Sequence, residues 1–160
     1  MHLASDDLAY NGLGVAEISM RNTDPARAAF SRAIGLNPSY AEALRNLARI
    51  HLAESHYDDA IPLLARSLNT EPTNVWAVVS LAYANLETHK YEEAATWALK
   101  VRDLPPPRDP AAYYIAGCAF GALGKRAEAI EEFEAYLREE PQGANAPKAR
   151  EYLSRLSASQ

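Results

Sequence analysis

Four prolines recur at a nearly constant interval along this chain. Pro38, Pro72 and Pro106 lie 34 residues apart, and Pro141 follows 35 residues after Pro106. In a structural repeat, many equivalent positions of successive units hold similar residue types, and not only the one position that marks the interval. We call each such set of equivalent positions a column. The interval therefore predicts a repeat architecture, which the residues between the prolines can test.

Two columns between the prolines hold only very small side chains. Twelve residues before the prolines lie Ala26, Ala60, Ala94 and Ala129, and 24 residues before them lie Gly14, Ala48, Ala82 and Gly117. Other columns are mostly large and apolar, such as the column of Phe30, Leu64, Ala98 and Phe133. A small residue facing a large one lets two helices approach closely. Each period is therefore predicted to be a hairpin of two helices.

These columns resemble the tetratricopeptide repeat, a 34-residue unit that carries an aromatic residue, then Leu-Gly, then Ala, Phe and a closing Pro. Residues 41–74 are similar to the consensus of that family, including the sequence YDDAI at residues 57–61. The resemblance implies an all-α fold, a right-handed superhelical solenoid of antiparallel helix hairpins. It implies a single domain with four repeats at about residues 7–40, 41–74, 75–109 and 110–143.

Capping chemistry predicts helix starts independently of the repeat. Ser39 and Glu42 have the spacing of a capping box. Asp24 and Asp109 each precede a proline, which is favoured at the first helical position. Residues 146–157 are apolar on one side only and predict a C-terminal capping helix, because the last unit of a solenoid needs a polar outer face.

Composition excludes several classes of function. The net charge of −5 and the pI near 5.4 argue against a nucleic-acid partner, which requires a concentrated basic stripe. No segment approaches the roughly 20 apolar residues of a membrane span, and the N-terminus lacks a signal-peptide pattern. We expect the chain to remain where it is made, cytoplasmic by default, unless a targeting signal was removed from a longer parent protein.

No group of residues predicts catalysis, a metal site or a cofactor. Cys118 is the only cysteine, and no histidine lies at a neighbouring hairpin position. His51 and His56 are five residues apart and would diverge around a helix, and His89 does not complete a metal-binding set with them. We therefore expect no catalytic residue, no metal ligand and no cofactor, and we predict that the protein is not an enzyme.

The candidate binding surface is the face of the first helix of each hairpin that packing does not use. In the family that the chain resembles, this face lines a concave groove, and Val15 and Arg49 hold equivalent positions on it. Of the residues that form the carboxylate clamp of chaperone-tail-binding relatives, only Asn46 has a match here, which argues against a cochaperone of that kind. The predicted peptide-binding residues are Asn11, Arg45, Asn46, Arg49, Trp76, Val79, Tyr83, Tyr114 and Cys118.

Two chemical features stand out in this set. Arg45 and Arg49 are one helical turn apart, so both could hold one carboxylate through charge-assisted hydrogen bonds. Trp76, Tyr83 and Tyr114 offer flat amphipathic surface of the kind that anchors peptides. Alternatively, Arg45 pairs with Glu42 on its own helix, or Tyr83 is buried between hairpins.

The predicted function is a non-enzymatic scaffold for protein–protein interaction. It would bind a peptide segment or a partner protein that carries acidic and apolar or aromatic residues. One alternative is a regulatory or recruitment domain excised from a larger enzyme or envelope-assembly protein. Another is a self-assembly module that uses the N-terminal edge, although a monomer is favoured.

Overall fold

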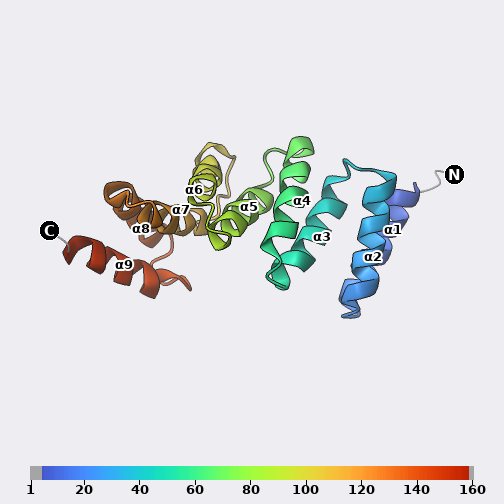
Figure 1. Cartoon of the computed structure of the whole chain (residues 1–160), viewed down its shortest axis with the longest axis horizontal. Helices are drawn as coiled ribbons and strands as arrows, with labels where there is room; N and C mark the ends of the chain where they lie inside the picture. The colour runs from blue at the N-terminus through green and yellow to red at the C-terminus, as the bar shows by residue number, and fades with distance from the viewer. Residues whose placement is uncertain (1–4, 159–160) are drawn as a thin grey trace. The chain divides into compact units, whose positions relative to one another are not determined.

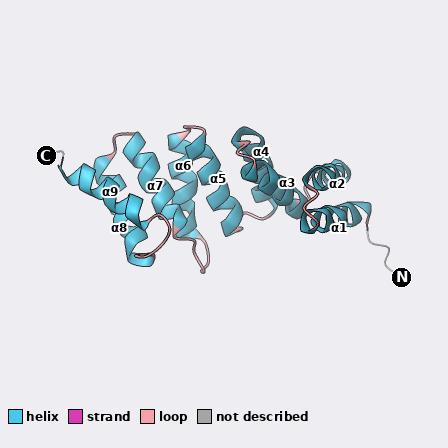
Figure 2. Cartoon of the chain, turned by 90° about the horizontal axis from the view of Figure 1, so that it is seen from below, coloured by secondary structure: helices cyan, strands magenta, loops and turns pink. Residues whose placement is uncertain are grey.

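The computed structural model describes residues 5–158 (Figure 1). The described residues form nine α-helices and one 3-10 helix with no strand, and Figure 2 shows loops only between helices. This confirms the predicted all-helical fold. The helices are α1 (Asp6–Ser19), α2 (Thr23–Leu36), α3 (Ala41–Ala53), α4 (Tyr57–Thr70), α5 (Val75–Glu87), α6 (Tyr91–Lys100), η1 (Val101–Asp103), α7 (Ala111–Ala122), α8 (Arg126–Glu139) and α9 (Ala146–Ala158).

The chain forms two compact units that divide after Ala77, near the start of α5. In unit 1, the described residues up to 77, α1 packs against α2, α3 packs against α4, and α2 also contacts α3. In unit 2, the described residues from 78 onward, α7 packs against both α6 and α8, and α9 packs against α8. Among the described residues no helix is both long and apolar enough to cross a membrane.

Close approach of paired helices depends on the small-residue columns. A Cβ atom built at Gly14 would lie 2.5 Å from Cε1 of Phe30, and one built at Gly117 would lie 2.8 Å from Cδ1 of Phe133. Real carbon atoms do not approach so closely, so only glycine fits at either position. Phe30 is 1% exposed and joins Ala26 and neighbouring apolar residues in the core of unit 1. The predicted match of small and large residues is therefore confirmed in both units.

The turns inside the hairpins share a backbone conformation. Arg21, Ser55, His89 and Gly124 all have positive φ, between 60° and 72°. Each is followed by a residue whose N–H donates to a carbonyl five residues earlier, as His56 does to His51 at 2.8 Å. This bond closes the end of the preceding helix. The turn therefore repeats with the same period as the prolines, although its residue types differ.

Two of the predicted helix caps are wrong. The hydroxyl of Ser39 donates to Oδ1 of Asn37 at 3.0 Å, a local bond that competes with capping, and α3 begins after Tyr40 without a side-chain cap. Helix α2 begins at Thr23, which places Asp24 inside the first turn. At α7 Oδ1 of Asp109 accepts the N–H of Ala111 at 2.9 Å as predicted, although Pro110 lies one residue before the first helical residue, Ala111.

Helix α9 packs against α8 of the preceding hairpin. The rings of Tyr152 and Phe133 stack with centroids 5.2 Å apart and an interplanar angle of 3°. Ala146 and Ala149 are buried, whereas Tyr152 keeps 41% of its surface exposed. Helix α9 therefore covers Phe133 with one face of the Tyr152 ring.

Candidate peptide-binding surface

Unit 1 contains a hollow bordered by α1, α2 and α3, which we call the α1–α3 hollow. Its cavity volume is about 370 Å³. The side chains around it are Val15, Ile18, Ser19, Thr23, Phe30, Asn46, Arg49, Ile50, Ala53 and Glu54. Phe30 and Ile50 are buried and form an apolar floor, while Val15 and Ile18 are 45% and 43% exposed. The hollow therefore offers apolar surface with polar groups beside it.

The two predicted arginines have separate partners. Nη1 of Arg45 lies 2.6 Å from Oε2 of Glu71, so Arg45 pairs with Glu71 and not with Glu42. The guanidinium carbon of Arg49 lies 4.5 Å from the centre of the Trp76 ring, in a cation–π contact. Only Arg49 lines the α1–α3 hollow. A joint clamp of both arginines on one carboxylate is therefore not preformed.

The asparagines of unit 1 join two helices. Nδ2 of Asn46 donates to Oδ1 of Asn11 at 3.1 Å, and Nδ2 of Asn11 donates to Oε1 of Glu42 at 3.0 Å. Asn11 is buried, so its amide serves this connection between α1 and α3. Asn46 lies beside the hollow and shares one of its hydrogen bonds with this network.

The remaining predicted residues lie in unit 2. Val79 is 8% exposed, so it presents almost no side chain at the surface, whereas Tyr83 is 39% exposed. The ring of Tyr114 contacts the rings of Phe133 and Tyr136, with centroids 5.9 and 5.6 Å away. Cys118 is half-buried beside Tyr114.

Burial is the main influence on the pKa values of Tyr114 and Cys118 in unit 2. It raises the pKa of the Cys118 thiol, against a hydrogen bond with Tyr114 that lowers it. Burial also raises the pKa of the Tyr114 phenol, and the neighbouring Cys118 adds to the effect. Both groups are therefore neutral near pH 7, and neither is an activated nucleophile.

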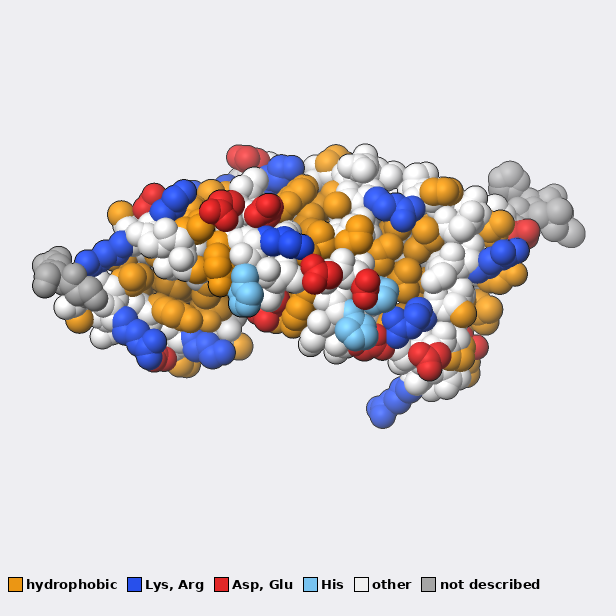
Figure 3. All heavy atoms as spheres, in the orientation of Figure 1, with side chains coloured by type: hydrophobic (Ala, Val, Ile, Leu, Met, Phe, Trp, Pro, Cys, Tyr) orange, Lys and Arg blue, Asp and Glu red, His pale blue; other side chains and the backbone are white. Residues whose placement is uncertain are grey.

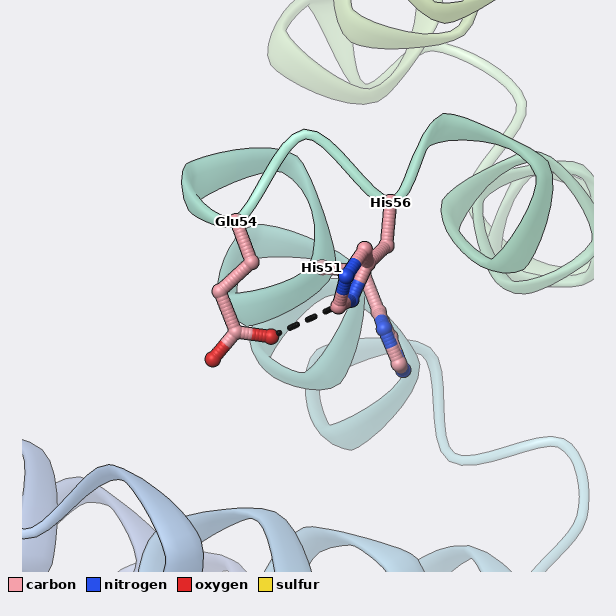
Figure 4. A group of neighbouring side chains, drawn as sticks. All are labelled: His51, Glu54 and His56. Atoms are coloured by element: carbon pink, nitrogen blue, oxygen red, sulfur yellow. Dashed lines mark ion pairs between the residues drawn. The ribbon is translucent and has the colours of Figure 1, made fainter.

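The structure brings together two histidines that the sequence pattern separated. Helix α3 ends at Ala53, and the positive φ of Ser55 turns the chain so that His56 returns toward His51. One ligand atom from each of His51, Glu54 and His56 lies within 4.8 Å of the others (Figure 4). The prediction that these histidines diverge was wrong because it assumed a continuous helix.

Sequence comparisons identify the repeat. A family model described as "Tetratricopeptide repeat" matches residues 11–75, and one described as "Anaphase-promoting complex, cyclosome, subunit 3", also of tetratricopeptide type, matches residues 53–136. A UPF0162 protein of Xylella fastidiosa is 34% identical over 128 residues, which are 77% of this chain and 44% of that protein. The general transcriptional corepressor trfA of Dictyostelium discoideum is 28% identical over 127 residues, 78% of this chain and 9% of that protein. The chain thus spans less than half the length of these relatives.

Solved structures agree with the sequence matches. A crystal structure of MamA protein superposes with a TM-score of 0.83 at 19% identity, covering 97% of this chain and 88% of that one. The structure titled "MamA 41-end from Desulfovibrio magneticus RS-1" gives a TM-score of 0.76 at 14% identity, covering 99% and 100%. At such identities the likeness shows the fold. The chain belongs to the tetratricopeptide repeat family, whose helical hairpins form scaffolds for protein–protein interaction.

Proposed function

We propose that unit 1 binds a segment of a partner protein at the α1–α3 hollow. The segment inserts an apolar side chain between Val15 and Ile18, and Arg49 pairs with an acidic group next to it. The observation that carries the proposal is the hollow itself, whose volume of about 370 Å³ lies within the range of about 300–1,000 Å³ that is usual for ligand sites. Its floor of Phe30 and Ile50 is apolar, as such sites usually are.

Charge supports an acidic group in the bound segment. Arg45 is largely shielded and already paired with Glu71, while Arg49 is exposed and stacked on Trp76. Stacking holds the guanidinium plane in place and leaves its edge able to donate two parallel hydrogen bonds to a carboxylate. Such a contact contributes about 1.5–3 kcal/mol when it is shielded from water, compared with about 0–1 kcal/mol for a solvated pair.

Unit 2 supplies a second candidate surface, which we consider by itself. Tyr83, Tyr114 and Cys118 present neutral aromatic and thiol groups suited to apolar side chains of a partner. Val79 and Asn11 are not included in the proposal, because both side chains are buried.

The test is selection of ligands from a random peptide library displayed on phage. We expect the enriched peptides to share an apolar residue next to Asp or Glu. A fluorescently labelled copy of an enriched peptide is then titrated with the wild-type protein, and with Arg49→Glu and Arg32→Glu. Arg32 lies on α2 outside the hollow, so its replacement makes the same change of charge elsewhere.

The proposal predicts that Arg49→Glu weakens binding at least about tenfold at low salt, equivalent to about 1.4 kcal/mol, while Arg32→Glu changes it far less. Val15→Asp, which places a charge at the apolar rim, should weaken binding as well. Equal affinities for wild type, Arg49→Glu and Val15→Asp would move the binding surface away from the α1–α3 hollow.

A further inference from the structure

The turn between α3 and α4 gathers three side chains with metal-ligating atoms. His51 lies in the last turn of α3, Glu54 directly follows that helix, and His56 directly precedes α4. Figure 4 shows the two imidazole rings side by side with the carboxylate of Glu54 directed at His56. Figure 3 shows histidine side chains at the surface of the face that it draws. The side chains of Glu54 and His56 are exposed, so an ion can reach them from solvent.

The spacing of these atoms suits a small divalent cation. Zn²⁺ binds histidine nitrogen and carboxylate oxygen at about 2.0–2.2 Å, so two ligands of a tetrahedral ion lie about 3.3–3.5 Å apart. Nδ1 of His56 and Oε2 of Glu54 are separated by 3.4 Å. The other distances between ligand atoms of the three residues are at most 4.8 Å. The side chains of Glu54 and His56 are exposed and can rotate to shorten them.

His51 provides a second, independent observation. Its Nδ1 atom is buried and has no hydrogen-bond partner among the described residues. The carboxylate of Asp59 lies 3.9 Å from this nitrogen, which is too long for a hydrogen bond. Buried polar atoms of folded proteins nearly always have a partner, and a bound ion can fill that role where no protein group does.

We propose that His51, Glu54 and His56 bind one late first-row divalent metal ion of the Zn²⁺ class, with water completing its coordination. Two imidazoles and a carboxylate are ligands that Zn²⁺ accepts, and three protein ligands leave one position open. Arg27 competes for the same carboxylate, because its Nη2 lies 2.7 and 2.8 Å from the two oxygens of Glu54. Metal binding therefore requires Glu54 to release Arg27 at least in part.

The experiment is calorimetric titration of the full chain, without an affinity tag, with ZnCl₂. We expect one Zn²⁺ per chain, and an affinity at least about tenfold lower in His51→Gln and in His56→Gln, since even outer-shell changes cost about 10–100-fold. His2→Gln and His89→Gln are the matched controls, because they remove the other two of the four histidines. Arg27→Gln should strengthen binding by freeing Glu54.

A second readout identifies the ligand histidines directly. Zn²⁺ should shift the imidazole nitrogen resonances of two histidines in the ¹⁵N-labelled wild-type protein, and those two should be absent from the spectrum of His51→Gln/His56→Gln. Binding that His51→Gln and His56→Gln leave intact would overturn the proposal, as would Zn²⁺ shifts confined to the control histidines. Glu54→Gln removes the carboxylate, and unchanged affinity in that variant would exclude Glu54 and overturn the three-ligand site. None of these readouts depends on peptide binding.

Discussion

Replacing Gly14 by alanine tests the interlocking of α1 and α2. The added Cβ would lie 2.5, 2.6 and 2.8 Å from three ring carbons of Phe30, whereas carbon atoms in contact are usually about 3.5–4.0 Å apart. The ring must therefore move by about 1 Å. It is 1% exposed and enclosed by the unit 1 core, so it has little space to move into. Overpacking of this kind costs about 1–3 kcal/mol.

Gly12 offers a matched control on the same helix. A Cβ atom built there has nothing within 4 Å, so Gly12→Ala should gain only the helix propensity of alanine, about 1 kcal/mol. Gly14→Ala gains the same propensity and adds the clash. It should therefore be about 1–3 kcal/mol less stable than Gly12→Ala, which corresponds to roughly 2–4 °C of melting temperature for each kcal/mol at this chain length.

Urea and thermal unfolding followed by far-UV circular dichroism measure this difference. Phe30→Leu in the Gly14→Ala background should recover part of the loss, because the smaller side chain vacates the space that Cβ requires. Equal stabilities of Gly14→Ala and Gly12→Ala would refute the close packing of Gly14 against Phe30.

Three further predictions concern unit 2. Burial raises the pKa of Cys118, so its alkylation at pH 7.5 should be slower than that of a free thiol, and unfolding in urea should abolish the difference. Burial raises the pKa of Glu132 above its ordinary 4.5 despite the opposing ion pair with Arg102, so the folded state binds that proton more tightly and stability falls as pH rises through the raised pKa. The melting temperature of Glu132→Gln relative to that of wild type should thus increase between pH 4.5 and pH 7. A difference in melting temperature that does not change with pH would contradict a raised pKa of Glu132. Tyr152→Ala should lose about 0.5–1.5 kcal/mol of ring stacking on Phe133 in urea unfolding, while Tyr152→Phe should match wild type.

The fold was predictable because its determinants repeat in the sequence. The pairing of Gly14 with Phe30, and of Gly117 with Phe133, follows from residue size at fixed spacing, and the structure places both pairs in contact. A pattern that occurs several times can be recognised even where one copy departs from it. Helix caps were less predictable, since the hydroxyl of Ser39 had a competing partner in Asn37.

The clustering of His51 and His56 could not be predicted from residue types. It depends on the positive φ of Ser55, and the equivalent turn positions hold Arg21, His89 and Gly124. Only glycine among these is typical of that conformation. The repeat period could have predicted this turn. Equivalent positions of every repeat fall between the two helices of a hairpin, so the chain has to reverse its direction at each of them.

The partners of Arg45 and Arg49 are distant from them in sequence. Arg45 pairs with Glu71, which lies after α4, and Arg49 stacks on Trp76, which lies at the start of α5. Helical periodicity places side chains on a face but does not determine which loop reaches them. The candidate surface was therefore predicted as a set of positions, and its contacts required the structure.

Nuclear magnetic resonance mapping of an enriched peptide on the labelled full chain tests the proposed binding surface most directly. The methyl groups of Val15, Ile18 and Ile50 and the side-chain resonances of Arg49 and Trp76 should shift on titration, with intermolecular contacts from an apolar peptide side chain to the first three. Shifts confined to the acidic helix α8, with α1 and α3 unaffected, would contradict binding at the α1–α3 hollow.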